Sequence, residues 1–426
     1  MSKIGKRNVL GGAVGNIFEW YDFAVFGFFA PVIATQFFPA DDSLAGLLKT
    51  FGVFAAGYLM RPLGGYIYGR IGDRAGRKKS LVISIIAMAV PTTLIGVLPT
   101  HAEAGIMAAA LLVFLRLAQG ISVGGEFVGS ICYLVETAPR RKRCYFGSWA
   151  VCGAIAGMLM GSGVAALVHG LLDEAQLQAW GWRLPFLGGL VVGVIGVWLR
   201  WDMQETPAFL EVLEADRVVA EPLMQALKEV PGRIFHLAGL VLLLGVSIYI
   251  LFIWMPTYVT HIANAPIPAL AVNTAAMAFM FVMMLLVGAL CDRVGIKPVL
   301  LASSAATALL VIPLFAWIDG GTLLAFVVAQ AIFAILVAGI QSPIPVAMVT
   351  MFPVQLRYSA IAGGYNATLA IFGGTGPLVA TWLINVTGQL SAPAWYLMIA
   401  ALISFVAAWR LNLKHTEPLG VTAHGD

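Results

Sequence analysis

The sequence predicts an all-α membrane protein with twelve transmembrane helices arranged in two pseudo-symmetric six-helix halves. First, 60% of its 426 residues are hydrophobic and 11% are charged, with a mean hydropathy of +0.91, which excludes a soluble globular protein of ordinary composition. Second, twelve apolar runs reach the ~20 residues that a helix needs to cross a bilayer. Third, a charged loop motif around Asp73 returns around Asp292.

The predicted spans follow one another with short connections. They lie at residues 14–38, 46–69, 80–99, 105–135, 144–170, 183–200, 233–260, 268–291, 298–317, 321–350, 359–386 and 392–411. An even number of spans puts both termini on one side of the membrane. Most Lys and Arg residues between the spans fall on that side, and only Lys49 and Arg183 are assigned to the other, so the positive-inside rule makes both termini cytoplasmic.

The longest polar interval divides the spans six and six. We therefore expect an N-terminal half at 1–200, a cytoplasmic linker at 201–232, a C-terminal half at 233–412 and a short cytoplasmic tail at 413–426. A second loop signature repeats across this divide, because Pro139-x-x-x-Arg143 precedes the fifth span and Pro353-x-x-x-Arg357 precedes the eleventh.

The repeated charged loop follows the second span of each half. GRIGDRAGRKK at 69–79 is echoed by GALCDRVGIK at 288–297. Three pairs of residues align: Asp73 with Asp292, Arg74 with Arg293, and Gly76 with Gly295. The Asp is the only acid in each turn and lies at a helix end beside cations, where it can pair with Arg or face a helix N-terminus. A solvated basic loop explains the charges but not the repeated spacing, so the pattern predicts a tight interhelical turn.

Ionisable residues also lie inside the predicted spans, where burial of a charge costs ~2.5–3.5 kcal/mol. The five that stand out are Glu19, Asp22, Arg61, Arg116 and Glu126. Glu19 and Asp22 share a helix face, and the spacing predicts one polar stripe on the fourth span, from Arg116 through Gln119 and Val123 to Glu126. Structural ion pairs are the alternative interpretation. Three acids against two bases nevertheless leave one carboxylate unmatched, and such a group binds a proton more readily than it does in water.

The second half carries aromatic and amide side chains in place of deeply embedded charges: Tyr249, Trp254, Tyr258, Gln330, Gln341, Tyr365 and Asn366. Two nearby segments, 255–258 and 372–377, contain the Gly and Pro residues that let a spanning helix bend or break. Helix packing alone explains any single aromatic, but together these side chains predict the wall of a cavity.

The repeated loop resembles the one between the second and third helices of the major facilitator superfamily. Arg116-Leu-Ala-Gln119-Gly120 is similar to that superfamily's fourth-helix R-x-x-Q-G element, whose arginine is linked with proton coupling. Six longer strings resemble the metabolite:proton symporter family of proline/glycine-betaine, α-ketoglutarate, shikimate and citrate permeases: GNIFEWYDF (15–23), RPLGG (61–65), RLAQGISVGGE (116–126), GWRLPF (181–186), QETPAF (204–209) and MFPVQLRYSA (351–360). The resemblance implies the major facilitator fold and proton-coupled symport by alternating access.

Expected roles follow from the embedded charges and the resemblance. The proton-coupling candidates are Asp22, Glu126, Arg116 and Glu19. The substrate-binding candidates are Arg61, Trp20, Tyr21, Gln119, Tyr249, Trp254, Tyr258, Tyr365 and Asn366. The candidates for a conformational latch at the cytoplasmic face are Gly69, Asp73, Arg74, Gly76, Arg77, Asp292 and Arg293. No catalytic or metal site is expected, because the four cysteines lack C-x-x-C spacing and the six histidines are scattered.

Charge balance favours a zwitterionic substrate such as proline or glycine betaine. A dianion or trianion would find only Arg61 and Arg116, whereas a zwitterion needs one cation for its carboxylate and aromatic faces for its ammonium group. Proton-coupled uptake of a carboxylate (α-ketoglutarate, shikimate or citrate) and passive facilitation by the same fold are the alternatives. A membrane enzyme is disfavoured because H-E-x-x-H and G-x-S-x-G are absent.

The remaining expectations concern the partners, the cofactor and the location of the protein. Its partners are a small-molecule substrate, protons and the lipid bilayer, with no nucleic acid and no obligate protein partner. No cofactor is expected, because a proton gradient would drive the process. The location is the cytoplasmic (inner) membrane, which the chain crosses many times.

Overall fold

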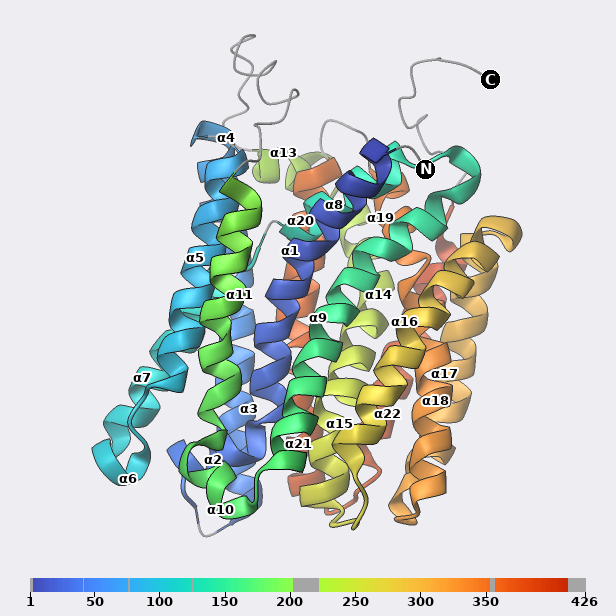
Figure 1. Cartoon of the computed structure of the whole chain (residues 1–426). Coiled ribbons are helices and arrows are strands. Elements are labelled where there is room, and N and C mark those ends of the chain that lie inside the picture. The colour runs from blue at the N-terminus through green and yellow to red at the C-terminus, as the bar shows by residue number, and fades with distance from the viewer. Residues whose placement is uncertain are drawn as a thin grey trace.

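The computed structural model describes residues 3–40, 42–75, 77–124, 126–201, 222–352 and 357–412, and all regular secondary structure in these ranges is helical. Long helices run side by side through the molecule (Figure 1). The side chains at 1–15 and 69–82 and that of Glu126 also lie outside the described part. The same holds for most of the predicted linker and for the predicted tail.

The N-terminal part of the bundle contains α1 (Lys3–Phe28), α2 (Ala30–Phe37), α3 (Ser43–Leu59), α4 (Arg61–Ala75), α5 (Arg77–Gly96), α6 (His101–Ala104), α7 (Ile106–Ser122), α8 (Glu126–Thr137), α9 (Arg143–Leu171), α10 (Glu174–Gln176) and α11 (Arg183–Trp201). A 3₁₀ turn, η1 (Arg140–Lys142), precedes α9, and a π-helical turn, η2 (Leu177–Gly181), follows α10.

The C-terminal part contains α13 (Pro222–Glu229), α14 (Pro231–Ile248), α15 (Met255–Thr257), α16 (Ala269–Val294), α17 (Ile296–Asp319), α18 (Leu323–Gln341), α19 (Ile344–Met351), α20 (Arg357–Thr368), α21 (Gly376–Thr387) and α22 (Ala392–Arg410). Three π-helical segments interrupt it, namely η3 (Tyr249–Trp254), η4 (Tyr258–Ile262) and η5 (Leu369–Gly373). They flank Pro256 and precede Pro377, so the helix distortion predicted near these prolines is confirmed.

Each predicted span has a helical counterpart. Within the described ranges, nine helical stretches are long and apolar enough to cross a membrane, and α1 with α2 makes a tenth that bends by 62°. Two shorter apolar stretches, Ile83–Gly96 and Arg183–Ile195, lie where the third and sixth spans were expected.

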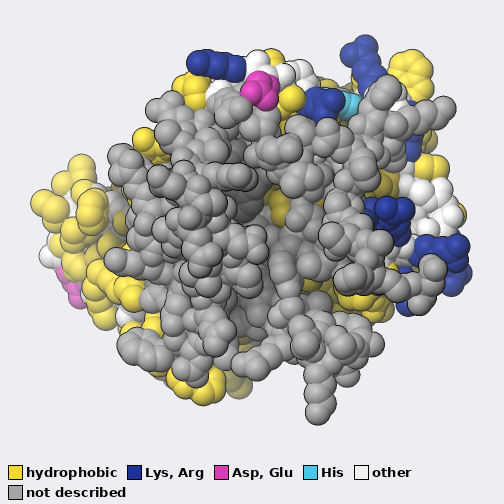
Figure 2. All heavy atoms as spheres, turned by 90° about the horizontal axis from the view of Figure 1, so that it is seen from above, with side chains coloured by type: hydrophobic (Ala, Val, Ile, Leu, Met, Phe, Trp, Pro, Cys, Tyr) yellow, Lys and Arg dark blue, Asp and Glu magenta, His cyan; other side chains and the backbone are white. Residues whose placement is uncertain are grey.

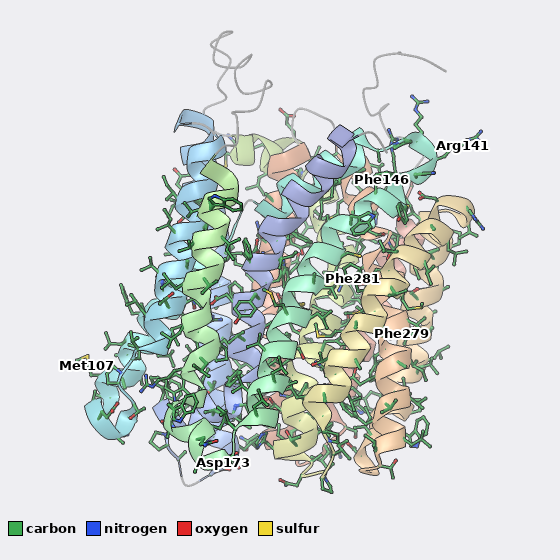
Figure 3. The ribbon with its side chains drawn as sticks, in the orientation of Figure 1. Met107, Arg141, Phe146, Asp173, Phe279 and Phe281 are labelled. Atoms are coloured by element: carbon green, nitrogen blue, oxygen red, sulfur yellow. The ribbon has the colours of Figure 1, made fainter. Side chains whose placement is uncertain are left out.

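We call the end of the bundle at the top of Figure 1 the basic end, because exposed Lys and Arg side chains gather on it. The helix α1 begins there, and Lys297 at the start of α17 donates to the carbonyl of Leu411, which follows α22. Exposed basic side chains at this end include Arg140, Arg141, Lys142, Arg233, Arg293 and Arg410. Figure 2 looks onto this end and shows Lys and Arg along part of its rim. In Figure 3, Arg141 marks the basic end, and Asp173 marks the opposite end.

The fourth span is not one continuous helix, so the prediction of a single polar stripe from Arg116 to Glu126 is wrong. The helix α7 ends at Ser122, Val123 is extended (φ −101°, ψ 113°), and α8 begins at Glu126. A methyl group on Gly124 would overlap the backbone of Gly65, which shows how closely the two chain segments approach at this break. Arg116 and Gln119 remain on one face of α7, and Glu126 belongs to another helix.

Gly120 sets an equally close approach between α7 and α3, because a methyl group added there would overlap the backbone of Gly57. We expect Gly120→Ala to destabilise the protein by ~1–3 kcal/mol through overpacking. Gly163, whose added methyl group would meet no atom within 4 Å, is the matched control. Thermal unfolding of purified protein measures both. Equal melting temperatures for the two alanine variants would contradict the close crossing of α3 and α7.

Candidate functional site

A buried carboxylate and a buried guanidinium share a polar network between α1, α5 and α7. The Asp22 Oδ1 atom accepts from Thr92 Oγ1 at 2.5 Å and from Gln119 Nε2 at 2.9 Å. Arg116 Nη1 donates to Gln119 Oε1 at 2.8 Å and lies 3.6 Å from Asp22 Oδ2. All four side chains are at most 2% exposed. A proton bound at Asp22 would remove the charge that holds Arg116, so this network can link protonation to side-chain position.

A second buried ion pair lies at the contact between the two parts of the bundle. Arg61 Nη2, at the start of α4, lies 3.2 Å from Glu19 Oε1 and 3.5 Å from Oδ1 of Asn366 in α20. Asn366 in turn donates to the carbonyl of Gly124 at 2.6 Å. Arg61 therefore touches helices from both ends of the sequence.

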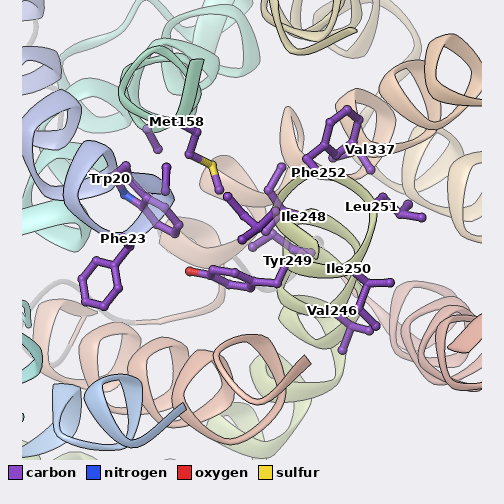
Figure 4. Close-up of a cluster of buried hydrophobic side chains, with 14 of the residues drawn as sticks. Trp20, Phe23, Met158, Val246, Ile248, Tyr249, Ile250, Leu251, Phe252 and Val337 are labelled. Carbon is purple, nitrogen blue, oxygen red and sulfur yellow. The ribbon is translucent and has the colours of Figure 1, made fainter. Parts of the chain in front are cut away.

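Aromatic rings surround Arg61. Its Cζ atom lies 5.4 Å from the ring centroid of Tyr58 and 5.7 Å from that of Trp20. Tyr249 of η3 stacks on Trp20 with centroids 6.1 Å apart, and its hydroxyl donates to that of Tyr58 at 2.7 Å. Figure 4 shows Tyr249 pointing across the interface toward Trp20 and Phe23 of α1.

The ring set continues through Phe127 of α8. Phe127 stacks on Tyr365 of α20 at 5.3 Å and meets Trp20 edge-on at 6.0 Å. We call Trp20, Tyr58, Phe127, Tyr249 and Tyr365 the aromatic cage. All five side chains are at most 5% exposed and come from both parts of the bundle.

Phe23 connects the two charged networks. The ring centroid of Phe23 lies 4.3 Å from that of Tyr58. The Cζ atom of Arg116 lies 5.0 Å from the ring centroid of Phe23. Asp22 and Phe23 are consecutive residues, so movement of Arg116 on protonation of Asp22 would be felt at the aromatic cage.

Both buried guanidinium groups keep hydrogen-bond donors that have no acceptor among the described residues. These donors are Nε and Nη1 of Arg61 and Nε and Nη2 of Arg116. An unsatisfied buried donor costs ~1–3 kcal/mol, and more when it is charged, which indicates a position where a ligand or water completes the bonding. The donors of Arg61 lie beside the aromatic cage, so this residue is the candidate for binding an anionic group of a ligand.

Four predicted substrate residues lie away from the cage. Tyr21 points to α11, where its hydroxyl donates to the Pro185 carbonyl at 2.9 Å. Trp254 and Tyr258 stack on each other with ring centroids 4.8 Å apart. Trp254 Nε1 donates to Thr381, and the Tyr258 hydroxyl donates to Asp319. Gln119 lies in the Asp22 network and not beside Arg61.

Sequence reasoning missed Tyr58, Thr92 and Phe127. Tyr58 precedes Arg61 by three positions and would share a helix face with it, so the spacing could have indicated it. Thr92 and Phe127 carried no such signal. A threonine in an apolar run is most simply explained by its bond to the preceding turn, which Thr92 also makes, to the Met88 carbonyl at 2.8 Å.

The second copy of the repeated loop contacts the other part of the bundle at the basic end. Gly295, with φ +96°, makes the turn between α16 and α17. The carboxylate of Asp292 accepts from the backbone amides of Cys144 at 2.8 Å and Tyr145 at 3.0 Å, the second and third residues of α9. A carboxylate at a helix N-terminus satisfies orphan donors and complements the helix dipole. Arg293 is exposed.

The first copy of the loop runs from the end of α4 into α5. Gly69, Asp73 and Arg74 lie in α4 and Arg77 begins α5, but their side chains lie outside the described part, as does Gly76 entirely. The role predicted for them stays a prediction. The same applies to the side chain of Glu126.

Comparisons with known proteins agree with this architecture. Residues 9–234 match the family model described as Sugar (and other) transporter, and residues 269–425 match that of the Major Facilitator Superfamily. The fold is similar to the partially occluded, inward-open xylose transporter XylE from E. coli, with a TM-score of 0.74 and 16% identity over 94% of this chain and 98% of the other. It is also similar to the crystal structure of a D-xylose-proton symporter, with a TM-score of 0.72 and 18% identity. The match covers 96% of this chain and 98% of the symporter chain. The predicted fold is confirmed.

Curated relatives place the chain more closely. It is 34% identical over 427 residues to the glycine betaine/proline/ectoine/pipecolic acid transporter OusA of Dickeya dadantii, covering 97% of this chain and 84% of the relative. It is 33% identical over 425 residues to the proline/betaine transporter of Escherichia coli K12, and this match covers 97% of this chain and 85% of the relative. The chain belongs to the major facilitator superfamily of transporters, in the family of these proline/betaine transporters. The prediction that the protein is a transporter is thereby confirmed, and so is the prediction that it is not an enzyme.

Proposed function

We propose that the protein carries a small zwitterion of the proline or glycine betaine type together with protons, by alternating access. The observation that carries this proposal is Arg61, whose guanidinium has unsatisfied donors and lies within an aromatic cage built from both parts of the bundle. The names of the curated relatives support the same substrate class. No cofactor enters the proposal, because a proton gradient would drive transport. The partners are the substrate, protons and lipid.

The substrate chemistry follows from the two kinds of group in the cage. Arg61 would bind the carboxylate, and Trp20, Tyr249 and Tyr365 would offer ring faces to the ammonium group, at ~0.5–2 kcal/mol for each favourable contact. In the structure the Arg61 guanidinium itself lies over the rings of Trp20 and Tyr58. A substrate ammonium group would replace it there while the guanidinium turns to the carboxylate. A di- or trianion would leave the ring faces unused and would meet the buried charge of Glu19.

Proton coupling is assigned to the Asp22 network. Ionised Asp22 holds Arg116, and protonation from outside would release Arg116 toward the face of Phe23. Phe23 touches Tyr58, so the change would reach the cage and favour substrate binding there. The loaded protein would then open toward the cytoplasm, where Asp22 loses its proton.

The basic end is assigned to the cytoplasm, which puts both termini inside and the protein in the cytoplasmic (inner) membrane. Its exposed arginines and lysines satisfy the positive-inside rule in this orientation. Asp292 at the N-terminus of α9 would close this face while the cavity is open outward, and Asp73 would act in the same way in the first half.

Asp292→Asn is expected to favour opening of the basic end. The variant keeps an acceptor but loses a charge–dipole interaction of ~0.3–2 kcal/mol, which corresponds to a ~2- to 30-fold shift in the open population. The readout is the rate at which maleimide labels Cys144, buried in the closed interface. Asp173→Asn is the matched control, because Asp173 caps α10 at the opposite end. Equal labelling rates in both variants would contradict the latch.

Ligand binding to purified protein tests the proposed substrate class. Thermal unfolding is measured with proline, glycine betaine, choline, α-ketoglutarate, shikimate and citrate, each at the same ionic strength. A ligand that binds only the folded state raises the melting temperature by mass action. We expect stabilisation by proline and betaine, weaker stabilisation by choline, and none by α-ketoglutarate, shikimate or citrate. Stabilisation by α-ketoglutarate, shikimate or citrate alone would reject the zwitterion and favour the carboxylate alternative.

A further inference from the structure

Two cysteine side chains from opposite parts of the bundle meet at the basic end. Cys144 is the second residue of α9 and Cys291 lies in the last turn of α16, with their Sγ atoms 3.1 Å apart. Both are free thiols, and they are 3% and 1% exposed. The other two cysteines, Cys132 and Cys152, are also buried.

The thiol pair lies within the contact made by the repeated loop. Asp292, the residue after Cys291, accepts from the amide of Cys144. One turn earlier in α16, a methyl group on Gly288 would meet the backbone carbonyl of Cys144 at 3.2 Å. The two helix ends are therefore closely packed where the sulfurs meet, and any separation of these ends also separates the sulfurs.

We propose that Cys144 and Cys291 form a thiol switch, which low-molecular-weight disulfides oxidise to an intramolecular disulfide that holds the basic end closed. The inference rests on the proposed function in one respect, namely that this end opens in every transport cycle.

The chemistry proceeds in two exchanges. When the ends of α9 and α16 part, the thiolate of one cysteine attacks a low-molecular-weight disulfide RSSR, which gives a mixed disulfide and one RSH. When the ends close, the second cysteine attacks the mixed disulfide, the Sγ–Sγ bond forms, and the second RSH leaves. Two protein thiols and RSSR thus give one protein disulfide and two RSH, with two electrons passing to RSSR. In a reducing cytoplasm the bond would form only when such disulfides accumulate.

The test uses the full-length protein in proteoliposomes with Cys132→Ser and Cys152→Ser, so that only the pair remains. The oxidant is 2,2′-dithiodipyridine, which releases an absorbing thiopyridone at each exchange. Substrate uptake is measured before oxidation, after oxidation and after dithiothreitol. Peptide mass analysis under non-reducing conditions identifies the bridge. The control carries Cys144→Ser and Cys291→Ser in addition.

We expect two thiopyridones per protein, a Cys144–Cys291 linked peptide and at least a tenfold fall in uptake, reversed by dithiothreitol and absent in the control. A bridged protein that transports at the unoxidised rate would overturn the switch, as would thiols that release two thiopyridones without bridging. An equal loss of uptake in the control would also overturn it. Failure of the unoxidised protein to take up proline or betaine, with the bridge still formed, would instead count against the proposed function.

Discussion

Asp22→Asn is expected to abolish proton-driven accumulation of substrate while exchange of substrate across the membrane continues. Asparagine keeps the acceptor for Thr92 and Gln119 but cannot release a proton, so it mimics the protonated state. For one proton carried across 100 mV, worth ~2.3 kcal/mol, the lost accumulation is about 50-fold. Accumulation and counterflow in proteoliposomes measure the two activities separately.

The matched control for this variant is Asp319→Asn. Asp319 is another carboxylate bonded to a neutral hydroxyl, that of Tyr258, but it lies at the end of α17 and outside the Asp22 network. It should keep normal accumulation. If Asp22→Asn accumulated substrate as the unsubstituted protein does, the assignment of proton coupling to Asp22 would be wrong, and Glu126 and Glu19 would become the remaining carboxylate candidates.

Arg61→Gln is expected to weaken binding of the zwitterion by about 30-fold or more, because loss of one partner of a buried charged pair costs ~2–5 kcal/mol. The effect should depend on the carboxylate of the ligand. Glycine betaine should lose affinity, and choline, which has the same trimethylammonium group and no carboxylate, should not. Titration of each ligand against purified protein gives both dissociation constants.

The Arg61 variant also removes the buried ion pair with Glu19, which by itself would destabilise the protein. The double variant Glu19→Gln/Arg61→Gln removes both charges and separates the two effects. If the double variant regained normal stability but still bound betaine poorly, the role of Arg61 as carboxylate ligand would stand. Recovery of tight betaine binding in the double variant would contradict it.

Much of the fold was predictable because its determinants are local. Apolar length gave the spans, and the repeated loop gave the turn that Gly295 makes with its positive φ. The break between α7 and α8 was not predictable, because Val123 and Gly124 leave the helix where the backbone of Gly65 approaches. That approach depends on how two distant helices cross, which periodicity along one helix does not contain.

The candidate site was predictable in its composition but not in its pairings. The embedded charges were found from the sequence, yet whether Arg61 meets Glu19 or Asp22 depends on helix rotation and crossing. For the same reason the sequence could not show which aromatic side chains reach the aromatic cage. Tyr249 and Trp254 lie five residues apart in one π-helical segment, and only Tyr249 reaches the cage.

Uptake of labelled proline and glycine betaine into proteoliposomes, under an inward proton gradient and with an uncoupler control, tests the central claim most directly. The account predicts accumulation above the external concentration, lost with the uncoupler, and no accumulation of α-ketoglutarate, shikimate or citrate. Uptake that only equilibrates and ignores the uncoupler would contradict proton coupling. Accumulation of a carboxylate alone would contradict the zwitterion site formed by Arg61 and the aromatic cage.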